Sequence, residues 1–340
     1  EIGVRLVGSE MCIRDSSIVT RKDYLDLLKV MLISARKNTS LHLVCLYDGN
    51  TNDLVYKLLK EFNVEIILHQ LPYKQELMEI YPREWMLQNL GREIEYNRIF
   101  GTFMRMEIPV VEKEEKYVLY SDIDVIFNAD ILLEELPHPT YLAAAPEYER
   151  NVEDMEYFNA GVLVMNIQGM KEKYEEFILK MKNRERNISG LFDQGYLNEL
   201  CFKDMELLPI EYNWKPYWGI NDKAKLIHFH GMKPSSNLNE AGFITDNSFF
   251  RIVFDANPGG YAGYVYYFTQ FYDYLGRKED KWLYNHLQEV FNLYKDPSFF
   301  FSKYNKYKLK YQKYKKYYLV TLGISCVLLI LLCLTLILQQ

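Results

Sequence analysis

The sequence predicts an α/β fold with a mixed, mostly parallel central sheet, because strand and helix patterns alternate along the chain. Residues 22–38 place apolar side chains on a broad helical face, and residues 41–49, "LHLVCLYDG", form an apolar run closed by Asp-Gly. A second helix is predicted at 51–62, where Thr and Asn can cap its start, and a second strand at 64–71. A parallel sheet of this kind is covered by helices on both faces.

The alternation resumes after a longer irregular stretch. A predicted helix at 93–108 carries Arg105 and precedes a predicted strand at 117–120, which runs into the triplet Asp-Ile-Asp and then "VIF". The remaining predicted elements are strands at 141–147 and 161–167 and an amphipathic helix at 170–184. We expect a single α/β domain over residues 17–258.

Composition and charge exclude several classes of protein. The net charge is −6, yet the chain from Phe301 onward holds seven lysines and no acidic residue. A nucleic-acid binder would carry its basic patches on the folded domain, so no nucleic-acid partner is expected. The phosphate-binding patterns GxGxxG and GxxxxGK[ST] do not occur. The five cysteines form no CxxC pair, which is typical of a reducing compartment.

The C-terminal part has the pattern of a membrane anchor. Residues 319–338, "LVTLGISCVLLILLCLTLIL", are uncharged, and a helix of that length spans about 30 Å, the thickness of a hydrocarbon core. Residues 259–318 are expected to form a helical, Tyr/Lys-rich juxtamembrane region. Five tyrosines would line one helical face: Tyr304, Tyr307, Tyr311, Tyr314 and Tyr318. The lysines predict a single-pass membrane protein whose folded domain faces the cytoplasm. Alternatively, the Lys/Tyr helix packs on the domain.

The N-terminal segment has an unusual sequence. Residues 7–16, "VGSEMCIRDS", resemble translated sequencing adapter, and they lack the apolar core of a signal peptide. We therefore expect residues 1–16 to be a sequencing artefact or a non-native N-terminus and leave them out of the predicted fold. "SIVT", residues 17–20, would then be the remainder of the first strand. The alternative is a natural N-terminus.

Two aspartates, Asp122 and Asp124, follow an apolar run in "YSDIDVIF", residues 120–127. Carboxylates beside a buried strand are costly unless something pairs with them. Their partner could be a lysine, solvent or a metal ion. Hard carboxylate oxygens suit Mg²⁺ or Mn²⁺, and a diphosphate would complete the coordination shell. The carboxyl ends of strands are also where α/β sheets bind ligands. An exposed turn is the alternative explanation.

Polar residues in three other segments could contact a nucleotide sugar. "FNAGVLVMN" places Asn159, an amide that can bond a hydroxyl, and Gly161, which permits close backbone approach, before a strand. "FDQGYLNEL" places Asp193 and Gln194 at a helix start, where Asp could instead be the N-cap. Tyr24 in "TRKDYLDLL" could stack on a base, or it could face the core.

A histidine motif lies further along the chain. In "LIHFHGMKPS", residues 226–235, His228 follows a predicted strand, and Gly231 and Lys233 come shortly after. A neutral imidazole can ligate a metal, glycine exposes its backbone N–H, and lysine offers charge to a phosphate. A histidine satisfied within a turn is the favoured reading of His230.

Taken in order, these motifs resemble those of glycosyltransferase family 8, the retaining GT-A-fold enzymes that include glycogenin and bacterial galactosyl- and glucosyltransferases. The resemblance covers roughly residues 17–235. It depends on the combination of Thr-x-x-x-Tyr, an Arg-bearing helix before Asp-x-Asp, "FNAGVLVMN", "DQGYLN" and "HFHGMKP". A C-terminal helical segment and one transmembrane helix would follow the GT-A-type domain.

The resemblance implies roles at the nucleotide and the metal. Thr20 and Tyr24 would hold the uracil of a UDP-sugar. Asp122 would contact the ribose and the metal, Asp124 would bind the metal more directly, and His228 would be the third protein ligand. The implied cofactor is Mn²⁺, or Mg²⁺.

It also implies roles at the diphosphate and the donor sugar. Gly231 and Lys233 would hold the diphosphate. The residues around the sugar would be Arg105, Asn159, Gly161, Asp193 and Gln194. Gln194, Asp193 and Lys233 would be the catalytic set. Gln194 would act as a dipole near the anomeric carbon, because same-face attack lets the leaving phosphate accept the proton.

The sequence departs from the family pattern at two positions of the histidine motif. The family spacing is HxxGxxKP, whereas here Lys233 comes one residue early. His228 and Gly231 fit the pattern, Lys233 is displaced, and His230 becomes a rival ligand. Ser235 replaces the Trp that commonly follows Lys-Pro.

The expected function is therefore metal-dependent, retaining transfer of a hexose from a UDP-sugar to a hydroxyl of a surface glycan or lipid-linked acceptor. One alternative is a nucleotidyltransferase that makes sugar nucleotides, although "SIVTRKDY" lacks the Gly-rich loop such enzymes usually have. Another alternative is a catalytically silent, membrane-anchored UDP-sugar-binding module.

Overall fold

The computed structural model describes residues 4–8, 22–90, 93–187, 192–231, 233–234 and 260–276. The chain divides into two compact units, Glu1–Asp280 and Lys281–Gln340, and every described residue lies in the first. The predicted transmembrane helix at 319–338 lies outside the described residues. Within the described ranges, no helix is both long and apolar enough to cross a bilayer.

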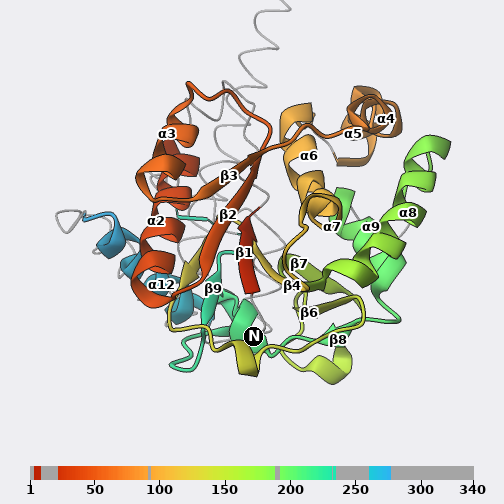
Figure 1. The fold of residues 1–340 in the computed structure, drawn as a ribbon. Coiled ribbons are helices and arrows are strands. Elements are labelled where there is room, and N and C mark those ends of the chain that lie inside the picture. The colour runs from red at the N-terminus through yellow and green to blue at the C-terminus, as the bar shows by residue number, and fades with distance from the viewer. Residues whose placement is uncertain are drawn as a thin grey trace, which may run out of the picture. The chain divides into compact units, whose positions relative to one another are not determined.

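A seven-stranded mixed sheet forms the centre of this unit (Figure 1). Its strands, in spatial order, are β3 (Glu65–Leu68), β2 (His42–Tyr47), β1 (Val4–Gly8), β4 (Tyr117–Ser121), β7 (Phe158–Asn166), β6 (Leu142–Pro146) and β8 (Glu206–Leu207). Strands β3, β2, β1 and β4 run parallel to one another, whereas β7 runs antiparallel to both β4 and β6. The predicted α/β class and the mixed sheet are confirmed.

An interior strand of the sheet corrects one expectation. Residues 1–16 were left out of the predicted fold, but Val4–Gly8 is β1, which pairs with β2 on one side and β4 on the other. The reason is the apolar "VRLVG" run, which has strand character whatever its origin. Residues 17–20, expected to be the first strand, lie outside the described residues. The non-native origin of residues 1–16 stays a prediction.

A second, two-stranded sheet pairs β5 (Val125–Phe127) with β9 (Leu226–His228) in antiparallel register. Val125 lies opposite His228. Pairing of strands about 100 residues apart thus brings the Asp-x-Asp segment next to the histidine motif. The segment at Trp214 adds a parallel bridge to Ile227 on the other edge of β9.

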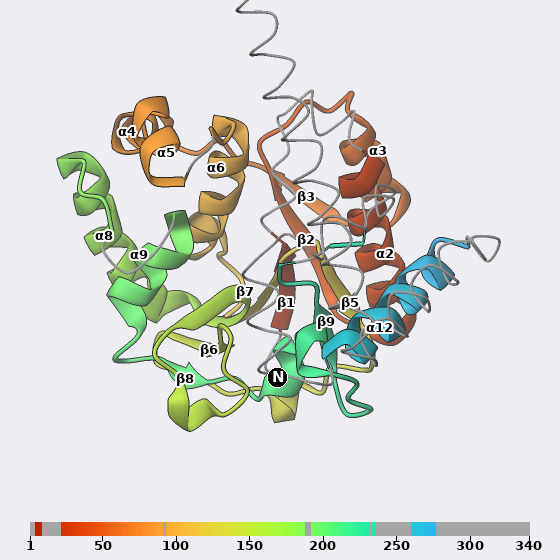
Figure 2. The same cartoon turned by 180° about the vertical axis from the view of Figure 1, so that it is seen from behind.

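Helices cover the sheet on both sides (Figures 1 and 2). They are α2 (Lys22–Asn38), α3 (Leu54–Glu61), α4 (Lys74–Ile80), α5 (Arg83–Leu90), α6 (Tyr96–Phe103), α7 (Ile108–Val111), α8 (Ile167–Asn183), α9 (Phe192–Cys201) and α12 (Gly260–Tyr274). In both views, α2 and α3 lie to one side of β1 and β2, and α8 and α9 lie to the other. Short 3₁₀ turns occur at Met104–Glu107, Leu133–Glu135, Val152–Asp154, Ile210–Asn213 and Pro216–Trp218.

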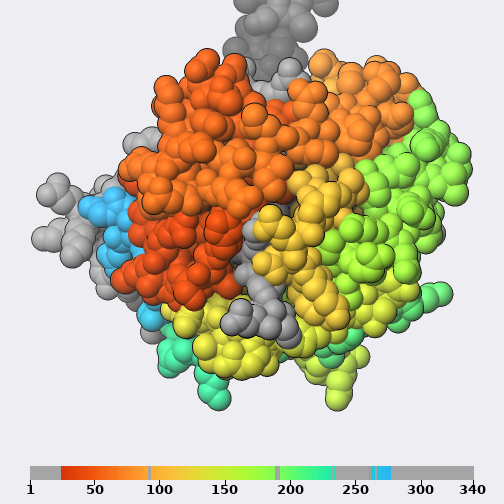
Figure 3. Space-filling view, in the orientation of Figure 1, coloured from red at the N-terminus to blue at the C-terminus, as the bar shows by residue number. Residues whose placement is uncertain are grey.

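The helix predicted at 93–108 is interrupted. Helix α6 ends at Phe103, and Arg105 lies on the 3₁₀ turn that follows. Pro109 explains this, because it lacks the N–H that would bond the carbonyl of Arg105 in a continuous α-helix. The N–H of Ile108 donates to that carbonyl instead. On the surface, residues of α6 and α7 lie between those of α2–α3 and those of α8 (Figure 3).

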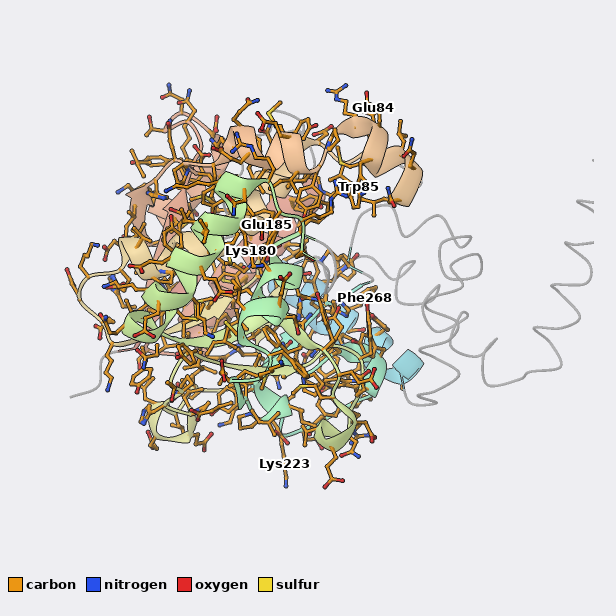
Figure 4. All side chains as sticks on the ribbon, turned by 90° about the vertical axis from the view of Figure 1, so that its right-hand side faces the viewer. Glu84, Trp85, Lys180, Glu185, Lys223 and Phe268 are labelled. Atoms are coloured by element: carbon orange, nitrogen blue, oxygen red, sulfur yellow. The ribbon has the colours of Figure 1, made fainter. Side chains whose placement is uncertain are left out.

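The main core lies between the sheet and helices α4 to α9. Phe103, Phe177 and Tyr196 are fully buried there, and the rings of Phe103 and Phe177 stack with centroids 6.1 Å apart. Burying a ring of this size contributes ~2–3 kcal/mol. At the surface of the same layer, Lys180 lies 3.7 Å from Glu185 (Figure 4). This core fixes β4 and β7, whose ends carry the candidate site.

Helix α12 packs against α2 and the 3₁₀ turn at Pro216–Trp218. Its Phe268 (Figure 4) contacts Phe229, with ring centroids 5.5 Å apart, and its Tyr264 hydroxyl donates to the His230 carbonyl at 3.1 Å. Residues 259–318 were expected to form a helical, Tyr/Lys-rich juxtamembrane region, and α12, its described part, contacts the histidine motif.

Candidate active site

The two aspartates lie where β4 ends and β5 begins. Asp122 is 7% exposed and Asp124 is 1% exposed. The backbone N–H of Asp122 donates to Gly161 at 2.8 Å, and the carbonyl of Asp124 accepts from Phe229 at 2.9 Å. The pair is therefore held between β7 and the end of β9, and it is not an exposed turn.

Asp122, Asp124 and His228 form the cation cluster. Each offers a ligand atom, and these atoms lie within 4.8 Å of one another. Oδ1 of Asp124 is 3.5 Å from Nε2 of His228. This oxygen is buried, and among the described residues no hydrogen bond reaches it. Two carboxylates, an imidazole and an unsatisfied buried oxygen fit a hard divalent cation.

The second histidine of the motif belongs to a different group. Nε2 of His230 is 3.0 Å from Oε1 of Glu147, and Nδ1 is 3.0 Å from the Tyr217 hydroxyl. Among the described residues, His228 is the histidine that lies with the two aspartates, which favours it over His230 as the candidate ligand.

Arg105 connects the cation cluster to the start of α9. Its guanidinium is 4% exposed, with Nη2 3.1 Å from Asp122 and Nε 2.9 Å from Asp193. It also donates to the carbonyl of Ala160 and lies 4.7 Å from the centroid of the Tyr120 ring. A buried network of this kind sets the positions of both carboxylates.

Gln194 and Asn159 lie together on the sugar side expected from the sequence. Oε1 of Gln194 accepts from the Ala160 N–H at 2.8 Å and lies 3.5 Å from Nδ2 of Asn159. Nδ2 of Asn159 also donates to Glu147 at 2.7 Å. The structure therefore brings Asn159, Asp193 and Gln194 next to the cation cluster.

Gly161 packs directly against the imidazole of His228. A Cβ at this position would lie 2.2 Å from Cε1 and 2.7 Å from Nε2 of His228, far closer than real contacts allow. The absence of a side chain thus lets the imidazole rest on β7. The approach of substrate to this backbone, implied by the resemblance, stays a prediction.

Lys233 forms an ion pair with Oδ2 of Asp124. The displaced spacing of the motif therefore still delivers a positive charge to the site, although here it faces a carboxylate. Gly231 has φ +86°, a conformation that favours glycine. The diphosphate roles of Gly231 and Lys233 stay predictions.

The structure describes one of the two residues that were expected to hold the uracil. Thr20 lies outside the described residues. Tyr24 lies in the first turn of α2 and is partly buried. Both assignments remain expectations from the resemblance.

Comparison with known proteins identifies the domain. Residues 16–237 match the family described as Glycosyl transferase family 8. The chain belongs to glycosyltransferase family 8. A putative glycosyltransferase of Haemophilus influenzae is 27% identical over 146 residues, which are 38% of this chain and 43% of that protein. The chain thus matches less than half the length of this curated relative.

Solved structures of transferases are also similar. Mouse xyloside xylosyltransferase 1, in its apo form, is 14% identical with a TM-score of 0.47, and the match covers 68% of this chain and 99% of that one. The galactosyltransferase LgtC, in complex with donor and acceptor sugar analogs, is 18% identical with a TM-score of 0.48, covering 75% and 96%.

Membership in family 8 confirms the predicted resemblance and the assignment of the domain to the glycosyltransferases. The match ends at residue 237. Helix α12 lies beyond it, so the helix that supports the histidine motif is outside the family-matched segment.

Three buried polar residues beside the family-8 motifs were not predicted from the sequence: Glu147, Asn213 and Lys215. Burial alone would raise the pKa of Glu147, but His230, the Asn159 amide and Lys215 lower it to about 2. Burial lowers the pKa of the Lys215 ammonium to about 7, against the opposing effect of Glu147. A usable signal existed for Glu147, which directly follows the apolar run of β6 at its carboxyl end.

Proposed function

We propose that this domain transfers a hexose from a UDP-sugar to an acceptor hydroxyl with retention of anomeric configuration. The observation that carries the proposal is the cation cluster, which lies at the strand ends of a family-8 domain. Its carboxylates and imidazole suit Mn²⁺ or Mg²⁺. Asp122, Asp124 and His228 would hold the ion, and the ion would neutralise charge that develops on the leaving diphosphate.

The chain's own residues would orient the donor and stabilise charge. Arg105 holds Asp122 and Asp193 in place through a buried ion network. Gln194 would offer its amide group to the sugar close to the anomeric carbon, and Asn159, whose amide is bonded to Glu147, Gly161 and Asn213, would support Gln194 from β7. Lys233, now paired with Asp124, would turn its ammonium toward the diphosphate once a cation neutralises that carboxylate. Preorganised charges of this kind stabilise a transition state without reorganisation.

The acceptor and the location belong to the same proposal. A surface glycan or lipid-linked acceptor would suit a chain held at the membrane by residues 319–338, with the domain in the cytoplasm. The apolar span and the lysines before it support this arrangement.

The test is a panel of UDP-sugars given to the full-length chain in detergent, with Mn²⁺, Mg²⁺ or EDTA. We expect UDP release from one or a few sugars, dependent on the divalent ion. NMR of a transferred product should show the donor's anomeric configuration. Release that is equal in EDTA would reject the metal role. Mn²⁺-dependent UDP binding with no hydrolysis or transfer would favour the silent binding module.

A further inference from the structure

Four buried polar side chains form a continuous hydrogen-bonded chain that ends at the metal-side histidine. It runs from Glu147, after β6, through Asn159 on β7 and Asn213 on a 3₁₀ turn, to His228 on β9. The successive donor–acceptor distances are 2.7, 2.9 and 2.9 Å. Each of the four residues is at most 4% exposed. Because water does not reach these groups, their donors and acceptors must match one another.

A backbone N–H fixes which group donates in each hydrogen bond from Glu147 to His228. The N–H of Gly161 donates to Oδ1 of Asn159 at 3.0 Å, and a main-chain N–H cannot accept. Asn159 therefore presents its oxygen to Gly161 and its Nδ2 to Glu147. The group of Asn213 that faces the Asn159 oxygen must be a donor, so it is Nδ2. Asn213 is left with only its oxygen to offer His228.

We propose that Asn213 is a positioning residue that holds His228 as the Nδ1–H tautomer, so that the lone pair of Nε2 faces Asp124 before any cation binds. An oxygen opposite Nδ1 requires a proton on Nδ1, and a neutral imidazole then has its free lone pair on Nε2. Nε2 is the atom that lies 3.5 Å from the Asp124 carboxylate. The purpose of this arrangement rests on the proposed function, whereas the tautomer itself does not.

Backbone bonds keep Asn213 in register with the histidine. The N–H of Trp214 donates to Leu226 at 3.0 Å, and the N–H of His228 donates back to Trp214 at 2.8 Å. The ring itself rests on Gly161, where no Cβ could fit. Packing therefore fixes the position of the imidazole, and Asn213 fixes which ring nitrogen carries the proton.

The first test measures the tautomer directly, without metal and without substrate. The chain has six histidines, so the full-length protein labelled with ¹⁵N-histidine gives a tractable NMR spectrum, and His228→Gln assigns the signal. We expect the shifts and couplings of an Nδ1–H tautomer. An Nε2–H tautomer, or an even mixture of the two, would overturn the inference.

The second test measures Mn²⁺ affinity. Asn213→Leu removes the oxygen and should weaken binding by ~10–100-fold, the usual effect of losing a partner behind a ligating histidine. Asn213→Asp keeps an oxygen opposite Nδ1 but loses the donor to Asn159, so it should bind Mn²⁺ more tightly than Asn213→Leu and less tightly than wild type. Asn128→Leu is the matched control, because the Asn128 amide donates to Ala224 at 2.9 Å, a carbonyl outside this chain of bonds. Wild-type affinity in Asn213→Leu, or an equal loss in Asn128→Leu, would overturn the inference.

The two measurements separate this inference from the proposed function. An Nδ1–H tautomer in a protein that binds no Mn²⁺ would support the inference and reject the metal role. Mn²⁺ binding by a protein whose His228 carries its proton on Nε2 would reject the inference alone.

Discussion

His228 and His230 are separated by one residue, and their ring centroids lie 5.7 Å apart, yet the two imidazoles contact different carboxylates. The N–H of His230 bonds back to the carbonyl of His228 at 2.7 Å, so the chain turns sharply after β9. His228 then faces the two aspartates, whereas His230 faces Glu147. A local turn, which motif spacing does not reveal, decides which histidine can ligate a cation.

The carboxylates near the two histidines also differ in how fully their oxygens are hydrogen-bonded. Around His228, Oδ1 of Asp124 is buried without a hydrogen bond in the described part of the chain. Around His230, Glu147 is matched by the imidazole and the Asn159 amide, and its pKa falls to about 2 despite burial. The group around His228 therefore has an oxygen left to bind a cation. The group of His230, Glu147 and Lys215, called here the support group, has its charges and hydrogen bonds matched internally. Variants in each group should therefore fail in different ways.

Among the variants, Asp124→Asn is expected to lower metal-dependent UDP release the most. This change removes the charge that a divalent cation needs, so metal-dependent UDP release should fall by at least about 10³-fold, while the far-UV circular dichroism spectrum stays that of wild type. The matched change in the other group is His230→Gln, which should keep Mn²⁺ binding. Equal turnover of Asp124→Asn and wild type would refute the role of the aspartate.

Arg105→Met should cause the next largest effect, on stability. It leaves Asp122 and Asp193 buried without their shared cation, which costs ~3–5 kcal/mol in the free energy of unfolding. Urea unfolding measures this cost. Arg184→Met is the control, because Arg184 pairs with Glu79 at 2.6 Å while both side chains are 42% exposed, and solvent screens such a pair so that its loss changes stability little. Similar losses in both variants would contradict the assignment of a buried network.

Lys215→Met tests the support group by the pH dependence of the free energy of unfolding. Burial lowers the folded-state pKa of Lys215 from 10.5 to about 7, so below pH 7 the folded protein must bury an ammonium. Between about pH 7 and 10.5 the unfolded chain holds a proton that the folded protein has released. The unfolding free energy of wild type should therefore rise relative to Lys215→Met, by about 2 kcal/mol from pH 7 to pH 9. A pH-independent difference would show that Lys215 keeps its charge.

Local pattern predicted the fold class and the Asp-x-Asp position, because both depend on alternation and on a polar residue ending an apolar run. The resemblance to family 8 added the prediction that His228 is a ligand. Local pattern did not predict that β5 pairs with β9, which joins segments about 100 residues apart. The link from Glu147 to Asn213 depends on the same distant pairings. The sequence predicted Arg105 on a continuous helix, whereas Pro109, which has no N–H for the Arg105 carbonyl, leaves Arg105 on a 3₁₀ turn.

Gly161→Ala is expected to have the smallest effect and links the two groups. Its Cβ would lie 2.2 Å from Cε1 of His228, so the imidazole must leave the position in which it now faces Asp124. Mn²⁺ affinity should then drop by roughly tenfold, the lower end of what a disturbed ligand costs. Gly169→Ala is the control, since its Cβ would meet the Thr140 carbonyl at 2.0 Å, an equally tight contact at the start of α8. That variant should lose stability and keep its Mn²⁺ affinity. If both variants lose affinity equally, general destabilisation explains the loss, and the fit of the histidine against β7 does not.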